Sequence, residues 1–201
     1  MSGAIMPKPS FTTRFQHCIK TESLITISDQ DQLESLKGKL ADEMGAPFGL
    51  HTMGLPAATS VLAMVLSFTL PQYAIWSVIL NFFSLPSHTV LAWIFFTAIL
   101  FSGVNAITVF LIGKGRMCAL KVHLMMAGMT LLLAITYFIG TLLATFDSTW
   151  GPGFGLTSAV VSLAFITVSI LCIRSNSFYL MLLYSLHNRA FRKLNALRKH
   201  V

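Results

Sequence analysis

From Met44 to Ile112 the chain contains no Asp, Glu, Lys or Arg, and long apolar runs continue almost to the C-terminus. A helix needs about 20 apolar residues to cross a hydrocarbon core of about 30 Å. Four segments are long enough, at about 55–80, 90–112, 120–145 and 156–173. A transmembrane barrel would instead show alternation over segments of about ten residues. The pattern predicts an all-α integral membrane fold with four transmembrane helices in a domain over residues 48–174.

Two residues interrupt the apolar character of these spans. Pro71 removes one backbone hydrogen bond from the first span, so we expect a kink near Ser67 or two shorter helical pieces. Asn105 is a strongly polar side chain deep in the second span. Its ordinary role would be an interhelical hydrogen bond worth roughly 1 kcal/mol. A substrate pathway that uses Pro71 and Asn105 is the alternative, because broken helices line the binding sites of transporters.

The composition supports a membrane location. Charged residues make up only 10% of the 201 residues and hydrophobic residues make up 55%, with a mean hydropathy of +0.73. Soluble domains carry roughly a quarter charged residues. The bilayer is therefore the expected solvent for most of this chain.

Lysine and arginine indicate the orientation. They lie in the loop after the second span (Lys114, Arg116, Lys121) and after the fourth span (Arg174, Arg189, Arg192, Lys193, Arg198, Lys199). With four spans both regions fall on one side, which the positive-inside rule makes cytoplasmic or matrix. We expect both termini on that side of a bacterial inner membrane or an organelle inner membrane. The cysteines (Cys18, Cys118, Cys172) then lie near a reducing compartment, so no disulfide is predicted.

Residues 1–47 are expected to form an N-terminal arm with one amphipathic helix at 29–44. The first twenty residues lack the apolar core of a signal peptide, and their basic composition, shared with organelle transit peptides, is interpreted as a solvated arm. Asp29 can cap the helix, whose apolar stripe comprises Leu33, Leu36, Leu40 and Met44. Such a stripe can pack on the chain itself, on the membrane surface or on a partner.

Residues 175–201 form the basic C-terminal tail. From His187 onward the tail has a narrow apolar stripe of Ala190, Leu194 and Leu197, which suits an amphipathic helix in the interface rather than a span. Its basic residues are the candidate lipid or partner surface: Arg189, Arg192, Lys193, Arg198 and Lys199. Anionic lipid headgroups or an acidic partner subunit would be attracted, and no nucleic acid partner is predicted. Arg174 either ends the fourth span or lies within a longer tilted helix.

Chemistry-bearing patterns are scarce in this sequence. Buried charges, a C-x-x-C pair and a phosphate-binding loop are all missing, which argues against a pump, a redox site or an NTPase. His51 and His123 fall at matching depth and are the only candidates for a haem pair. Interfacial histidines more often serve as polar side chains at headgroup level, so no cofactor is predicted except bound lipid, and no metal.

These features favour a non-catalytic membrane subunit or scaffold within a larger membrane protein complex. Its expected partners are other membrane-protein subunits, and no enzymatic activity is predicted. The alternative is a small homo-oligomeric carrier or channel with Pro71 and Asn105 near its pathway.

Overall fold

The computed structural model describes residues 10–45, 49, 54–146 and 154–199. Helix accounts for 90% of these residues, and they contain no strand. The prediction of an all-helical chain is therefore confirmed.

Four helical segments are long and apolar enough to cross a membrane. They are Leu55–Phe82, Ser87–Gly113, Met117–Ala144 and Gly155–Arg174. Within the described residues, the number of candidate spans agrees with the four predicted, and their lengths and compositions are compatible with a multi-pass membrane protein. The helices that form them are α3 (Leu55–Thr69), α4 (Gln72–Phe82), η1 (Ser87–Thr89), α5 (Val90–Gly113), α6 (Met117–Phe146) and α7 (Phe154–Arg174).

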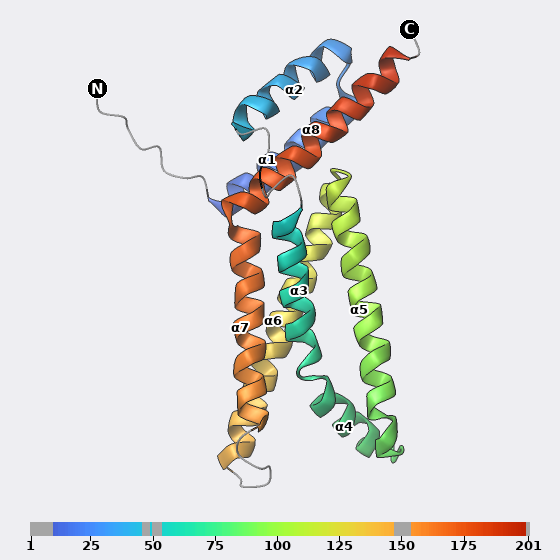
Figure 1. Ribbon diagram of the computed structural model, residues 1–201, viewed down its shortest axis with the longest axis vertical. Helices are drawn as coiled ribbons and strands as arrows, with labels where there is room; N and C mark the ends of the chain where they lie inside the picture. Colours follow the sequence, from blue (N-terminus) through green and yellow to red (C-terminus); the bar gives the residue numbers. More distant parts are fainter. Residues whose placement is uncertain (1–9, 46–48, 50–53, 147–153, 200–201) are drawn as a thin grey trace, which may run out of the picture.

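The first span is broken at Pro71, which produces two shorter pieces rather than one kinked helix. α3 ends at Thr69, and Pro71 is the N-cap residue of α4. The 15 residues of α3 extend for only about 22 Å, less than a hydrocarbon core of about 30 Å. α4 then turns away from the axis of α3 and packs against the N-terminal part of α5 (Figure 1).

α3 occupies the middle of the bundle, where it contacts α5, α6 and α7 (Figure 1). α6 crosses behind α3 at an oblique angle. Its 30 residues extend for about 45 Å, so a tilt is needed to fit them within a bilayer. The oblique course brings α6 from the end of α5 to the start of α7.

Three further helices lie together at the end of the bundle where α5 is joined to α6 (Figure 1). They are α1 (Phe11–Ile27), α2 (Gln30–Met44) and α8 (Asn176–Arg198), and we call them the end layer. α2 packs on α8, whereas α1 contacts both α8 and α6. The sequence analysis did not anticipate α1.

The link between α7 and α8 decides whether Arg174 ends the fourth span or lies within a longer tilted helix. α7 ends at this residue, and Ser175 adopts an extended conformation before α8 begins. The Ser175 hydroxyl caps α8 by accepting a hydrogen bond from the Phe178 backbone N–H at 3.1 Å. Arg174 therefore ends the fourth helix, and α8 leaves at an angle across the end of the bundle (Figure 1).

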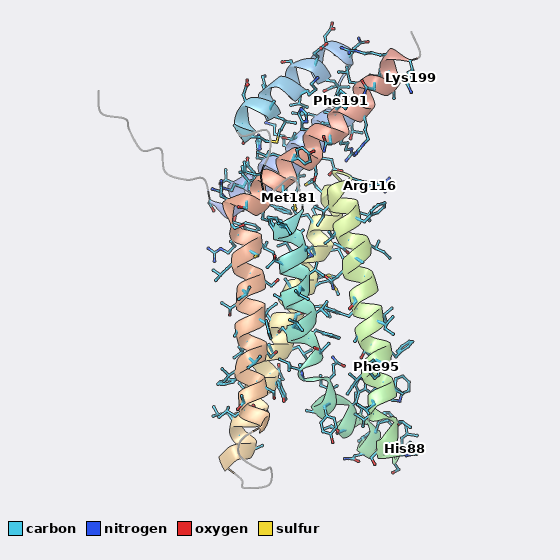
Figure 2. All side chains as sticks on the ribbon, viewed as in Figure 1. His88, Phe95, Arg116, Met181, Phe191 and Lys199 are labelled. Atoms are coloured by element: carbon cyan, nitrogen blue, oxygen red, sulfur yellow. The ribbon has the colours of Figure 1, made fainter. Side chains whose placement is uncertain are left out.

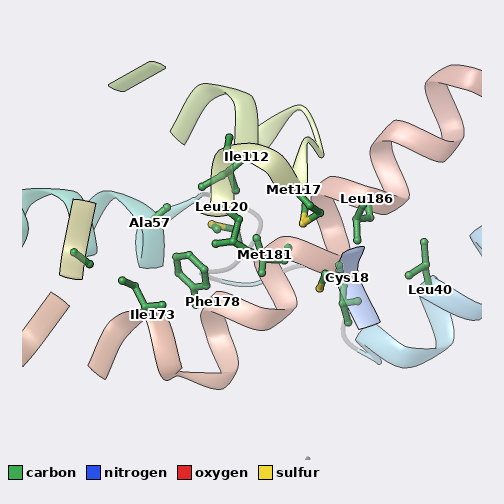
Figure 3. Packing of buried hydrophobic residues seen from close by; sticks show 14 of the residues in the cluster. Cys18, Leu40, Ala57, Ile112, Met117, Leu120, Ile173, Phe178, Met181 and Leu186 are labelled. Carbon is green, nitrogen blue, oxygen red and sulfur yellow. The ribbon is translucent and has the colours of Figure 1, made fainter. Parts of the chain in front are cut away.

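One apolar core connects the end layer to the spans (Figure 3). Phe178 of α8 is buried beside Leu120 of α6 and Ile173 of α7. Farther along α8, Leu186, Ala190 and Leu194 are buried, as are Leu33 and Leu40 on α2. Because α2 packs on α8, the apolar stripes noted in the two terminal segments cover each other within the chain.

Candidate functional site

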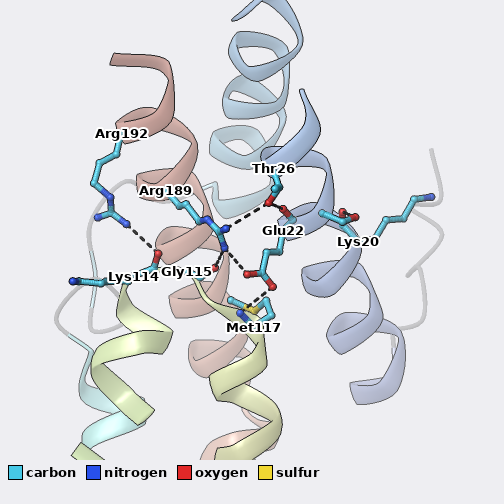
Figure 4. A network of polar contacts seen from close by, with 9 residues as sticks. Lys20, Glu22, Thr26, Lys114, Gly115, Met117, Arg189 and Arg192 are labelled. Carbon is cyan, nitrogen blue, oxygen red and sulfur yellow. Dashed lines mark hydrogen bonds and ion pairs between the residues drawn. The ribbon is translucent and has the colours of Figure 1, made fainter. Parts of the chain in front are cut away.

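Glu22 of α1 is the centre of a polar network between the end layer and the α5–α6 loop (Figure 4). Its carboxylate forms an ion pair with Arg189 of α8 and accepts a hydrogen bond from the Met117 backbone N–H at 3.0 Å. Arg189 also donates to the Gly115 carbonyl at 2.8 Å. Met117 is the first residue of α6, so a carboxylate from another helix satisfies one of the free N–H groups at this terminus.

Gly115 allows α8 to approach the loop. Its φ of +78° lies in the left-handed region that favours glycine. A Cβ atom there would lie 2.9 Å from the Ser185 backbone oxygen and 3.1 Å from Arg189 Cβ. Both the backbone conformation and the available space therefore require glycine.

Two further basic residues of α8 bind helix C-termini. Lys193 Nζ donates to the carbonyls of Ile25, Thr26 and Ser28 at 2.9, 2.9 and 3.1 Å, at the end of α1. Arg192 donates to the Lys114 carbonyl at 3.1 Å, at the end of α5. Cations are favourable at these positions, where unsatisfied carbonyls carry partial negative charge.

The last two residues of the predicted basic surface differ from one another. Arg198 forms an ion pair with Glu34 of α2 at 3.2 Å, between two exposed side chains. Lys199 is exposed and makes no ion pair within the described chain. Four of the five predicted lipid or partner residues thus contact this chain's own α1, α2 or α5–α6 loop. Sequence reasoning missed the contacts of Arg189 and Lys193 because it did not anticipate α1. It missed those of Arg192 and Arg198 because it assigned the basic residues to an external surface.

A second network holds the other end of the layer together. The Tyr179 hydroxyl donates to Glu43 Oε1 at 2.5 Å and lies 3.3 Å from His17 Nδ1. Burial and the hydrogen bond to Glu43 raise the pKa of Tyr179. Burial, with the nearby Glu43 charge, also raises the pKa of Cys18 to about 12. Cys18 is therefore a protonated, unreactive core residue at neutral pH.

Serine hydroxyls join α3 to α7 along one buried seam. Ser60 lies 3.0 Å from Ser169, and Ser67 lies 3.2 Å from Ser162, in each case between the Oγ atoms. The two serines on each helix are seven residues apart, which places them on one face. The heptad spacing was readable in the sequence but was not used, since small polar residues are also common outside helix contacts.

The break at Pro71 removes the helical partners of the Ser67 and Phe68 carbonyls, and both accept hydrogen bonds from side chains instead. Proline has no N–H for the Ser67 carbonyl, four residues earlier. That carbonyl accepts a hydrogen bond from Ser162 Oγ at 2.9 Å. The Phe68 carbonyl accepts from Gln72 Nε2 at 3.3 Å. Side chains thus replace the lost helical hydrogen bonds, as a helix break within a membrane would require.

Asn105 is fully buried but does not make the expected interhelical hydrogen bond. Its Nδ2 donates to the Phe101 carbonyl at 2.9 Å, one turn earlier in α5 itself. Such a bond is available because a short polar side chain in a helix reaches the carbonyl four residues back. Asn105 Oδ1 has no hydrogen-bond partner in the described chain.

His123, one of the two haem candidates, is buried in the serine seam. Its Nε2 lies 3.1 Å from Ser60 Oγ, and its ring stacks on Phe178. The other candidate, His51, lies outside the described residues. The described residues contain no group of three His, Cys, Asp or Glu side chains that could hold a metal ion.

Comparisons with known proteins add no family to this description. No protein-family model matches the chain, and neither curated proteins nor solved structures give a significant match. The function is therefore argued from the side chains themselves.

Proposed function

We propose that this chain is a non-catalytic, multi-pass subunit or scaffold of a larger membrane protein complex. It would lie in a bacterial or organelle inner membrane, with both termini on the cytoplasmic or matrix side. Its partners would be other membrane-protein subunits.

The observation that carries this proposal is the use of partly buried charges in structural contacts. Glu22 and Arg189 pair with each other and with the α5–α6 loop. Lys193 is bound to the end of α1. These contacts attach the end layer to the spans, as a scaffold needs.

The pair of Ser60 and His123 is the nearest approach to a catalytic arrangement. The side chains are within hydrogen-bond distance, as a nucleophile and its base would be. Both residues are completely buried, and His123 Nδ1 has no partner in the described chain that would orient the ring. The pair is better explained as a contact between α3 and α6.

The carrier alternative depended on a helix break that offers free backbone groups to a solute. At Pro71 the Ser67 and Phe68 carbonyls are already bonded to Ser162 and Gln72. This arrangement supports a structural break. Asn105 Oδ1 remains the one observation in favour of a pathway.

The test should look for protein neighbours at the least covered span. The window in Ser87–Gly113 is 17% buried within the chain, against 33% for Gly155–Arg174. We would place a photo-reactive amino acid at Phe95 of α5 (Figure 2) and, as a matched control, at Leu171 of α7, since both side chains are well exposed. Native mass spectrometry of the protein extracted in lipid nanodiscs would give the stoichiometry.

A scaffold subunit predicts a different protein, in fixed stoichiometry, crosslinked at Phe95 and not at Leu171. A homo-oligomer crosslinked to a second copy, together with solute uptake by reconstituted vesicles that Asn105→Leu abolishes, would transfer the assignment to the carrier. A monomer without crosslinks at either position would contradict both.

A further inference from the structure

We propose that the cleft between α1, α8 and the α5–α6 loop binds the phosphate headgroup of an anionic phospholipid. The cleft has a volume of about 600 Å³ and opens to the outside. Five cations line it: Lys114, Arg116, Arg189, Arg192 and Lys193. Ile25 and Thr26 of α1 form the remaining wall.

The positive charge in this cleft is largely uncompensated. Glu22 neutralises Arg189, but within the described chain no carboxylate forms an ion pair with the other four cations. Arg192 and Lys193 donate to neutral carbonyls, which leaves their charges in place. Arg116 is exposed, and its guanidinium makes no hydrogen bond or ion pair in the described chain. A phosphate group supplies the charge and the acceptor oxygens that such a cluster lacks.

The position of the cleft favours a lipid over a soluble anion. Lys114 directly follows the span that ends at Gly113, and Arg116 directly precedes the span that begins at Met117. Both residues would therefore lie at headgroup depth in a bilayer. The Lys114 ammonium lies 4.4 Å from the ring centroid of Phe110, an exposed apolar residue of α5. A headgroup in the cleft would thus have exposed apolar surface beside it for its acyl chains.

The residue that follows the cleft residue Thr26 adds further apolar exposure. Ile27, at the end of α1, is 78% exposed. An exposed isoleucine beside a basic cleft suits the interface between headgroups and acyl chains. The inference needs the membrane placement proposed above but does not need the subunit role.

The test measures lipid binding by the purified full-length protein in detergent, using native mass spectrometry with phosphatidylglycerol and with phosphatidylcholine. The cleft variant is Lys114→Gln/Arg116→Gln/Arg192→Gln. The matched control is Lys121→Gln/Arg174→Gln/Lys199→Gln, which removes three exposed cations outside the cleft. We expect one tightly retained phosphatidylglycerol, weakened at least about tenfold in the cleft variant and less than about threefold in the control.

Arg116→Gln alone guards against misfolding, since the Arg116 side chain is exposed and forms no hydrogen bond or ion pair in the described chain that would be lost. It should weaken phosphatidylglycerol binding without lowering the melting temperature. Equal weakening in the two triple variants, or equal retention of phosphatidylcholine, would overturn the site. Full displacement of the lipid by millimolar inorganic phosphate would show a site for soluble phosphate instead. Loss of lipid binding with the crosslinks at Phe95 intact would separate this inference from the scaffold proposal.

Discussion

The spans and the end layer are held together by different interactions. Between α3 and α7 the polar contacts are neutral serine hydroxyls, whereas the end layer combines an apolar core with ion pairs such as Glu22 with Arg189. Apolar side chains cover much of the outside of the spans, for example Phe95 and Leu132. The outside of the end layer is mostly polar.

The difference fits the solvent proposed for each region, lipid around the spans and water around the end layer. In lipid, burying a leucine between helices gains no hydrophobic free energy, so contacts depend on small residues and hydrogen bonds. In water, an apolar stripe such as Leu33 and Leu40 is driven to find a partner stripe. Charged groups at the edge of that core then select which helices pair.

The largest predicted effect is at the junction of the two regions. Gly115→Ala introduces a Cβ at φ +78° and 2.9 Å from the Ser185 backbone oxygen. We expect a loss of about 2 to 5 kcal/mol, because strain and overpacking each cost about 1 to 3 kcal/mol. Unfolding in mixed micelles measures the loss, and limited trypsin digestion at α8 shows whether that helix has detached.

Gly113→Ala is the control for this substitution. No atom lies within 4 Å of a Cβ at Gly113, so the free energy of unfolding should change by less than about 0.5 kcal/mol. Equal effects of the two substitutions would show that the close approach of α8 to the loop does not hold the layer in place. The same geometry makes Gly113, and not Gly115, the suitable position for a labelling cysteine in a test of orientation.

A smaller effect distinguishes two ion pairs of the end layer, Glu22 with Arg189 and Glu34 with Arg198. Glu22→Gln leaves Arg189, whose side chain is only 28% exposed, without its countercharge. We expect a loss of about 1 to 2 kcal/mol that persists at high salt, because a partly buried charge is poorly screened. Glu34→Gln removes the pair with Arg198, where both side chains are about half exposed. Its cost should be about 0 to 0.5 kcal/mol and should vanish as salt rises.

Chemical unfolding at low and high salt gives both values. If the two substitutions cost the same and respond alike to salt, the Glu22 pair contributes no more than a surface pair does. The end layer would then be held mainly by its apolar core and its uncharged hydrogen-bond acceptors, rather than by the Glu22 pair.

Much of the fold was predictable because apolar runs and charged segments are clearly separated along the sequence. Long uncharged runs identify the four spans, and Pro71 identifies the break in the first. The hydrogen-bond partner of Asn105 was not predictable, because its side chain can reach either a carbonyl of its own helix or a group on a neighbouring helix. In a span that is apolar on all sides, periodicity does not separate the protein-facing side from the lipid-facing side.

The contacts of the basic tail were harder to foresee. Its charges suggested an external acidic or lipid surface, yet Arg189, Lys193 and Arg198 contact α1 or α2. Sequence alone does not reveal that Glu22 lies on a helix beside α8, since α1 has only a weak apolar stripe. The cleft cations came from two distant segments, which only the fold brings together.

The smallest predicted effect tests the hydroxyl contacts of the spans. Ser162→Ala removes the donor to the Ser67 carbonyl, which Pro71 leaves without a helical partner. We expect a loss of about 1 kcal/mol, in the range measured for hydrogen bonds between membrane helices. Ser67→Ala removes the reciprocal bond to the Ser162 carbonyl. That carbonyl lies within the continuous α7, so Ser67→Ala should cost less.

A double-mutant cycle with Pro71→Ala measures this dependence directly. An alanine at position 71 returns an N–H that can reach the Ser67 carbonyl, so the cost of Ser162→Ala should fall to about half or less in that background. Thr167→Ala, which removes an exposed hydroxyl bonded only within α7, should be near neutral in both backgrounds. Additive effects of Ser162→Ala and Pro71→Ala in micelle unfolding would mean that the serine does not compensate for the proline. The seam between α3 and α7 would then depend on close packing of small residues, and polar bonds would contribute to the end layer but not to this seam.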